Sequence, residues 1–125
     1  YPTILDIHMP TTFKPTLYLK HACPFSFKFR IFLLEAGLLD VFKLREFESG
    51  TDAEEDVRQE LAPHFNKVSF PTVQVSEGVF MNESDTLIAH YAREAGVNPA
   101  ALPTFREYVT GPFATIIASY ARLAG

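Results

Sequence analysis

The hydrophobic positions along the chain change their spacing several times, and each change marks a new predicted element. Residues 16–19 (TLYL) form a short β-type run, and residues 20–22 form the loop that leaves it. From Pro24 to Ala36 the apolar residues recur at helical spacing, and Gly37 is suited to end that helix. Pro24 fits the first helical turn because its missing N–H would be unpaired there in any case.

This predicted helix is apolar on two faces. The first face is formed by Phe25, Phe29, Phe32, Leu33 and Ala36, and the second by Phe27, Ile31, Leu34 and Leu38. A helix with so wide an apolar surface is covered on more than one side. We therefore expect something besides the sheet to pack on it: the tail of the chain, a second copy or a missing domain.

The later segments alternate between strand-like and helical spacing. In order, they predict a half-buried strand over 40–47, a helix over 52–62, a hairpin of strands 70–75 and 79–81, a helix over 84–95, and a helical tail over 103–124 with a break at Gly111-Pro112. Ser84 is placed as the N-cap of the helix over 84–95. The acidic cluster over 52–56 favours a solvated helix start over a metal site.

This order of elements predicts an α/β fold. A β-α-β start requires a parallel strand pair with a right-handed crossover, and the hairpin and final helix complete a mixed four-stranded sheet with helices on both faces. That is the thioredoxin-like β-α-β-α-β-β-α plan. It assigns residues 15–96 to one domain. Residues 1–14 are an N-terminal arm with an extended piece at Ile4–Ile7, and residues 97–125 are a linker and a helical extension.

Composition narrows the functional classes. The chain has 125 residues, 47% of them hydrophobic, which fits one folded domain. Lys and Arg number 11 against 15 Asp and Glu, and this net charge of −4 argues against a nucleic-acid partner. Since no apolar run approaches the roughly 20 residues of a membrane-spanning helix, we expect no membrane role.

The single cysteine, Cys23, is the main candidate for chemistry. One cysteine permits no intramolecular disulfide, which favours a reducing, cytoplasmic setting. At the N-terminus of the predicted helix, unpaired N–H groups and the helix dipole favour a nucleophilic thiolate. The alternative is an inert, buried cysteine. The four histidines (His8, His21, His64 and His90) form no metal-ligand spacing with Cys23, so we expect no metal. His21 is near enough to influence the thiol, or is an exposed loop residue.

Three motifs carry a family resemblance. Residues 20–26 (KHACPFS), 69–73 (SFPTV) and 82–88 (NESDTLI) together resemble the N-terminal domain of cysteine-type glutathione S-transferases. The first motif is equally similar to monothiol glutaredoxins. The resemblance covers about residues 15–96. A full transferase continues into a helical second domain, so the chain is either a single-domain relative or a fragment.

The resemblance implies that Cys23 and Ser26 are catalytic. The Ser26 hydroxyl can hydrogen-bond the thiolate or a glutathione sulfur, or it bonds the helix backbone instead. The resemblance also implies a cis peptide bond before Pro71, which would turn the Phe70 N–H and C=O toward the cysteinyl part of glutathione. The alternative for Pro71 is an ordinary edge-strand proline.

The rest of the implied glutathione site comes from charged and polar residues. Glu83 and Ser84 would hold the ammonium and carboxylate of the γ-glutamyl group, whereas without the resemblance Ser84 is simply an N-cap. Lys20 matches the basic position for the glycine carboxylate in glutaredoxins, and Lys67 and Arg58 are other candidates.

The function expected from these features is glutathione-dependent thiol–disulfide exchange by a monothiol route. Glutathione is the co-substrate, the partner is a glutathionylated or electrophilic molecule, and a homodimer is possible. Two alternatives stay open. One is a non-catalytic, transferase-like interaction module, and the other is the front part of a glutathione-conjugating transferase.

Overall fold

A computed structural model describes residues 13–124 of the chain. The predicted extended piece at Ile4–Ile7 and His8 lie outside these residues. Residues 97–124 continue directly from the α/β unit as a helical extension.

The sheet has four strands in the order β2-β1-β3-β4. Their bounds are β1 (Thr16–Lys20), β2 (Lys43–Phe47), β3 (Thr72–Ser76) and β4 (Val79–Asn82). β1 and β2 are parallel, whereas β3 is antiparallel to both β1 and β4. This mixed sheet confirms the predicted thioredoxin-like plan.

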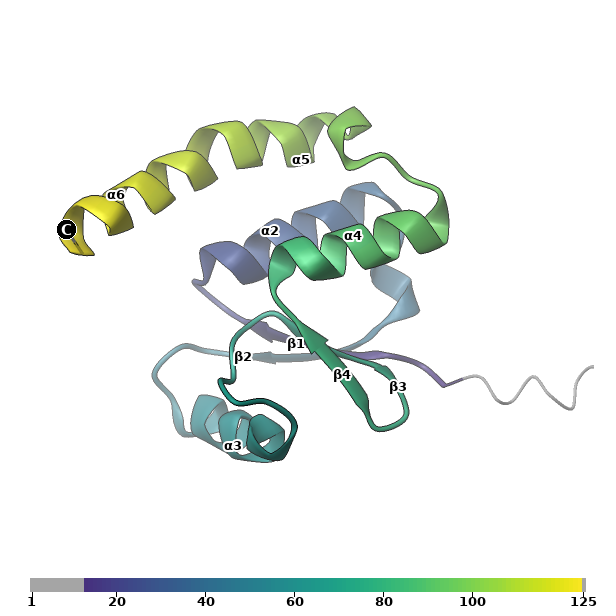
Figure 1. The fold of residues 1–125 in the computed structure, drawn as a ribbon, viewed down its shortest axis with the longest axis vertical. Coiled ribbons are helices and arrows are strands. Elements are labelled where there is room, and N and C mark those ends of the chain that lie inside the picture. Colours follow the sequence, from purple (N-terminus) through teal and green to yellow (C-terminus); the bar gives the residue numbers. More distant parts are fainter. Residues whose placement is uncertain (1–12, 125) are drawn as a thin grey trace, which may run out of the picture.

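The helices lie in layers on both sides of the sheet (Figure 1). Their bounds are α2 (Pro24–Glu35), α3 (Asp52–Leu61), α4 (Ser84–Ala95), α5 (Pro103–Tyr108) and α6 (Ala114–Ala124). α2 and α4 cover one face and α3 covers the other, while α5 and α6 form an outer layer across α2 (Figure 1). α6 extends beyond the edge of the sheet, and the C-terminus lies at its far end.

Alternation along β1 divides the core between the two faces of the sheet. Leu17 and Leu19 pack with α2 and α4, whereas Tyr18 packs with Val57 and Leu61 of α3. Successive side chains of a strand point to opposite faces, so one buried strand supplies both clusters. β1, an inner strand of the sheet, therefore leads directly from the core to the loop that carries Cys23.

The two apolar faces of α2 have different surroundings. Phe29, Phe32 and Leu33 of the first face are fully buried, as predicted. On the second face Tyr108 packs edge-on against Phe27, with ring centroids 5.3 Å apart, so the tail of the chain supplies part of the expected cover. Phe27 and Leu34 nevertheless remain 51% and 65% exposed.

Three predictions about the ends of elements are wrong. The hairpin strand placed at 70–75 begins only at Thr72. The segment at 39–41 is a 3₁₀ turn (Leu39–Val41), so β2 begins only at Lys43. The expected break at Gly111-Pro112 is instead a π-helical stretch (Val109–Phe113) that joins α5 to α6. Pro112 has no N–H to donate, and a wider turn accommodates this without ending the helix.

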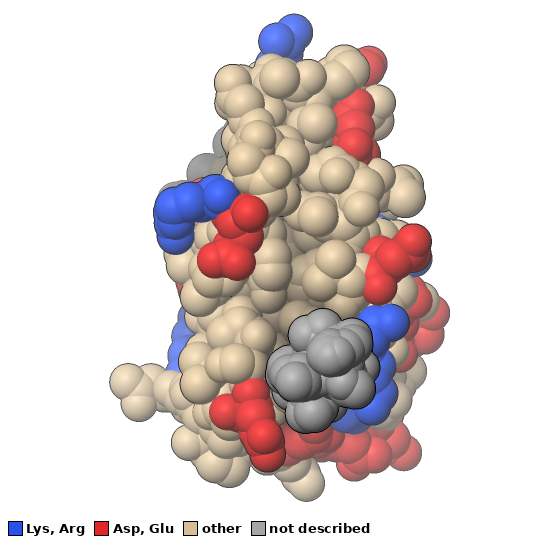
Figure 2. All heavy atoms as spheres, turned by 90° about the vertical axis from the view of Figure 1, so that its right-hand side faces the viewer, with Lys and Arg blue, Asp and Glu red and all other residues tan. Residues whose placement is uncertain are grey.

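The surface carries charges of both signs. On the face in Figure 2, acidic and basic side chains lie mostly toward the margins, often next to one another, around a broad uncharged area. Within residues 13–124, no helix combines the length and the apolar character that crossing a bilayer requires.

Candidate active site

Cys23 occupies the junction between β1 and α2, in extended conformation (φ −114°, ψ 119°) as the N-cap of α2. Its carbonyl accepts the first helical hydrogen bond, from the Phe27 N–H at 3.0 Å. The side chain is partly buried, and Sγ lies 4.0 Å from the Phe70 carbonyl oxygen. Among the described residues no side chain caps α2, so the N–H groups of its first turn are available to a negatively charged sulfur.

Ser26 lies one turn into α2 and is 2% exposed. Its Oγ accepts the Lys20 N–H at 3.2 Å, which ties the end of β1 to the helix. The partner is thus the strand backbone rather than the helix backbone. Because Oγ accepts this bond, the hydroxyl proton is left for another acceptor.

Phe70 precedes β3, and the Phe70–Pro71 peptide bond is cis, as the resemblance implies. The Phe70 ring is held edge-on by Phe47 at 4.9 Å between centroids, and the Arg58 guanidinium lies 5.1 Å from its centre. Within residues 13–124 the Phe70 N–H takes part in no backbone hydrogen bond outside the regular elements. An extended peptide could therefore pair with Phe70.

Ser84 is not the N-cap of α4. The cap is Glu83, whose side chain makes no capping bond, and Ser84 is the first helical residue. Ser84 is only 5% exposed, and no described residue bonds its hydroxyl. A hollow of about 150 Å³ opens here, lined by Phe25, Ser69, Phe70, Glu83 and Ser84. The sequence motifs around Phe70 and Ser84 therefore converge on one small cavity.

Backbone strain coincides with this site. Among residues 13–124, the non-glycine residues with positive φ are Ala22 at 62° and Glu83 at 77°. Each directly precedes a candidate site residue, Cys23 or Ser84. Such conformations are costly for residues with a Cβ and tend to occur where function requires a fixed backbone. Nothing in the sequence around Ala22 indicated this feature.

Two of the candidate cations share one buried carboxylate. Lys20 Nζ lies 3.1 Å from Glu54 Oε2, and Arg58 Nε donates to the same oxygen at 2.9 Å. The Gly50 N–H donates to the other oxygen at 2.8 Å. Lys20, Arg58 and Glu54 together form a cluster with a net charge of +1. The Arg58 guanidinium of this Glu54 cluster contacts the ring of Phe70. Lys67 is exposed and forms no ion pair with a described residue.

The prediction of a solvated helix start is wrong for Glu54, which is 8% exposed. The bond from the Gly50 N–H, with further bonds from Arg58 and Lys20, lowers the pKa of Glu54 to about 2. Its charged form is thus favoured in the folded state. The resulting stabilisation is complete above pH 4.5 and is lost as the pH falls toward 2.

Glu54→Gln is expected to lower the free energy of unfolding by about 2 kcal/mol at pH 7, because a buried carboxylate is replaced and two partly buried cations lose their counter-charge. The difference from the unsubstituted protein should shrink between pH 4.5 and pH 2, as the native carboxylate is protonated. Urea unfolding across this range measures it. Glu55→Gln, at an exposed position of the same helix turn, is the control. A constant difference down to pH 2 would contradict this assignment.

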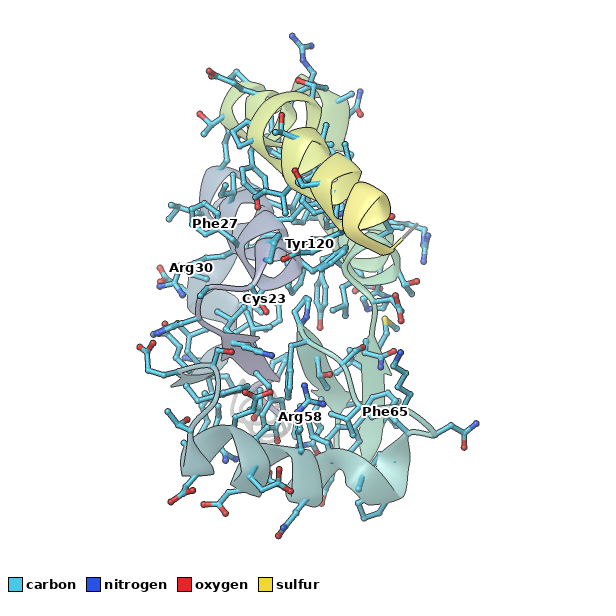
Figure 3. The ribbon with its side chains drawn as sticks, turned by 90° about the vertical axis from the view of Figure 1, so that its left-hand side faces the viewer. Cys23, Phe27, Arg30, Arg58, Phe65 and Tyr120 are labelled. Atoms are coloured by element: carbon cyan, nitrogen blue, oxygen red, sulfur yellow. The ribbon has the colours of Figure 1, made fainter. Side chains whose placement is uncertain are left out.

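A larger pocket of about 660 Å³ lies beside Cys23, away from the Ser84 hollow. Its lining is mostly apolar and comes from the β1–α2 loop, one side of α2 and α6: Leu19, Lys20, His21, Ala22, Cys23, Pro24, Ser26, Phe27, Arg30, Glu46 and Ile116. Figure 3 shows Phe27 and Arg30 along one side of α2, near Cys23. The volume is typical of a small-molecule site.

The helical extension also contacts the start of α2. The Tyr108 hydroxyl donates to the Pro24 carbonyl at 3.0 Å, and Phe113 packs edge-on against Phe25 with ring centroids 5.3 Å apart. Burial raises the pKa of Tyr108, and the neighbouring Cys23 adds to this effect. Sequence reasoning missed Tyr108, because periodicity within residues 103–124 does not reveal what they contact.

Among the described residues no group of three or more His, Cys, Asp or Glu is arranged to hold a metal ion. No model of a known protein family matches the chain, and no curated protein matches its sequence. The candidate site is therefore assigned from the structure alone. Phe70 lies next to both Cys23 and Ser84, and Arg58 of the Glu54 cluster contacts the Phe70 ring.

Proposed function

We propose that the protein catalyses glutathione-dependent thiol–disulfide exchange by a monothiol route, with Cys23 as the nucleophile. One observation carries the proposal. Phe70 is shared by both halves of the site: its carbonyl oxygen lies 4.0 Å from Cys23 Sγ, and it lines the hollow at the N-terminus of α4. A cysteinyl peptide paired with Phe70 would bring its sulfur to Cys23 and its N-terminal end to Ser84.

The polar groups around this path match the charges of glutathione. The unpartnered Ser84 hydroxyl and the α4 N-terminus suit the γ-glutamyl carboxylate, and exposed Glu83 suits its ammonium. The glycine carboxylate requires a cation. Lys20 and Arg58 supply it together, because their cluster keeps a net positive charge after pairing with Glu54. Lys67 is the exposed alternative.

The exchange needs two steps. The Cys23 thiolate attacks the glutathionyl sulfur of a mixed disulfide, so a Cys23–glutathione bond forms and the substrate leaves as a thiolate that takes a proton from water. A second glutathione thiolate then attacks the same glutathionyl sulfur, which releases glutathione disulfide and restores the Cys23 thiolate. The chain has no second cysteine, so the second thiol must come from solution. A reducing compartment such as the cytoplasm is the setting we propose.

Ser84→Ala and Glu83→Ala are each expected to weaken glutathione binding about tenfold, because each removes one partner of a charged ligand group. Thr86→Ala is the matched control, since Thr86 is an exposed hydroxyl residue of the same helix turn. Isothermal titration with the glutathione thioether S-methylglutathione, which cannot react with Cys23, measures affinity alone. Equal affinity in all three variants and the unsubstituted protein would remove this site assignment.

The large pocket beside Cys23 supports a second candidate function, the conjugation of glutathione to an apolar electrophile. The products distinguish the two reactions. Exchange yields glutathione disulfide, whereas conjugation yields a thioether that reducing agents do not cleave. Assaying both products with one enzyme preparation decides between these candidates.

A further inference from the structure

His21, in the loop that presents Cys23, is bound by two carboxylates at once. Its Nε2 lies 2.8 Å from Glu46 Oε1, and its Nδ1 lies 2.7 Å from Glu48 Oε2. Glu46 belongs to β2, and Glu48 directly follows that strand. His21 also donates its backbone N–H to the Phe47 carbonyl at 2.9 Å. Three hydrogen bonds therefore join this residue to consecutive positions of one neighbouring segment.

Both ring contacts can be hydrogen bonds in only one protonation state of His21. An ionised carboxylate only accepts hydrogen bonds, so both ring nitrogens must donate. A neutral imidazole has one N–H, and its other nitrogen would face a carboxylate oxygen with lone pair against lone pair. Only the imidazolium satisfies both contacts.

Besides these bonds, the loop is held at its start, where Lys20 donates its N–H to Ser26 Oγ at 3.2 Å. Lys20, before His21, is turned toward Glu54 of α3, and Ala22, after it, has a strained positive φ. From α2, Arg30 Nη1 donates to the same Glu46 oxygen at 2.9 Å, so Glu46 links the loop, β2 and the helix. Glu46, Glu48 and Arg30 are the charged groups that face the His21 ring from the elements packed against it.

We propose that His21 is a positioning residue for Cys23: its doubly bound imidazolium fastens the β1–α2 loop to β2 and so holds the thiol against the N–H groups of α2. Deprotonation removes one of the two ring contacts. The thiol is then held less firmly against the N–H groups of α2. As a result, the reaction rate of Cys23 per thiolate falls. As a statement about catalysis, this rests on the proposed function.

The direction of the pH effect follows from the bonds. Hydrogen bonds to Glu46, and then to Glu48, raise the pKa of His21 above its ordinary value of 6.5. Both ring contacts are therefore present below pH 6.5, and one of them is lost at a higher pH, as the ring gives up its proton. Gln at this position can donate to one carboxylate at any pH, so His21→Gln mimics the deprotonated state.

The test compares rates for the unsubstituted protein and His21→Gln from pH 6 to pH 9. Two rates are measured, Cys23 alkylation by iodoacetamide and exchange with glutathione disulfide. Each rate is divided by the thiolate fraction measured for that protein, so that a difference in thiol ionisation between the two proteins does not enter the ratio. The ratio should be about threefold at pH 6, falling to one as His21 is deprotonated. His90→Gln, at a histidine outside the site, should give a ratio of one throughout. In parallel, ¹⁵N NMR of the His21 ring should show two protonated nitrogens at pH 6.

A rate ratio of one at pH 6, a ratio independent of pH, or a neutral His21 ring at pH 6 would each overturn the proposal. Alkylation requires no glutathione site, so the two readouts separate the two hypotheses. A pH-dependent alkylation ratio without exchange in the unsubstituted protein would reject the proposed function and keep the positioning role. Exchange in the unsubstituted protein with a flat alkylation ratio would reject the positioning role alone.

Discussion

Cys23→Ser is expected to abolish the release of glutathione from a glutathionylated test peptide, with a loss of about a thousandfold or more in rate. A serine hydroxyl is not ionised near neutral pH and cannot form a disulfide, and the chain has no other thiol to replace it. The rate of glutathione disulfide formation, coupled to a glutathione reductase, measures the loss.

Ser26→Ala is the comparison for this experiment. It removes the bond from Oγ to the Lys20 N–H, together with any hydroxyl contact to the sulfur, but leaves the nucleophile in place. We expect a loss of only about fivefold to tenfold. Retained activity in Cys23→Ser would contradict the proposed mechanism. A loss in Ser26→Ala as large as that in Cys23→Ser would show that Ser26 takes part in the reaction.

Phe105→Ala is expected to lower the free energy of unfolding by about 3 kcal/mol, the cost of removing a buried aromatic ring. Phe105 is 9% exposed and packs edge-on against Phe32, with ring centroids 5.8 Å apart. Glu35 of α2 also accepts the Phe105 N–H at 2.7 Å, so side chain and backbone both anchor α5 on α2. Urea denaturation followed by circular dichroism measures the effect.

Tyr120→Ala provides the control for this experiment, since Tyr120 belongs to α6 of the same extension but is 50% exposed. Its replacement should change the free energy of unfolding by about 0.5 kcal/mol or less. If both variants unfolded like the unsubstituted protein, α5 would not belong to the folded unit, and the contacts of Tyr108 and Phe113 with α2 would lose their significance.

The order of elements was predictable because each element has its own periodicity. The helical spacing of Phe29, Phe32 and Leu33 identified the buried face of α2, and alternation around Phe42 and Leu44 identified the region of β2. These patterns report which side of an element is covered. For the same reason they were less informative at boundaries, where cap geometry and turns depend on single residues such as Glu83 and Pro112.

The candidate site was predictable only where its residues belong to short motifs. Cys23, Phe70 and Ser84 each stand in such a motif, and the structure brings them together. The polar contacts around them were not predictable, because they join residues far apart in the sequence. Tyr108 to Pro24 and Lys28 to Asp85 are examples, separated by 84 and 57 residues.

Lys28 illustrates what local patterns miss. A lysine on a helix suggests a solvated side chain, yet Lys28 is 5% exposed. Its Nζ lies 2.8 Å from Asp85 Oδ1 in the first turn of α4 and 4.3 Å from the centre of the Phe113 ring. This one ammonium group therefore links α2, α4 and the helical extension next to the Ser84 hollow, which no spacing in the sequence indicated.

We propose that Cys23 exchanges glutathione at a site formed by the folded chain. The most direct test of this proposal is intact-protein mass spectrometry after mixing with glutathione disulfide, timed against the same chain unfolded in urea. We predict one glutathionyl adduct, on Cys23, that forms faster in the folded protein and is removed by added glutathione. Formation no faster than in the unfolded chain, or an adduct that glutathione does not remove, would contradict the proposed function.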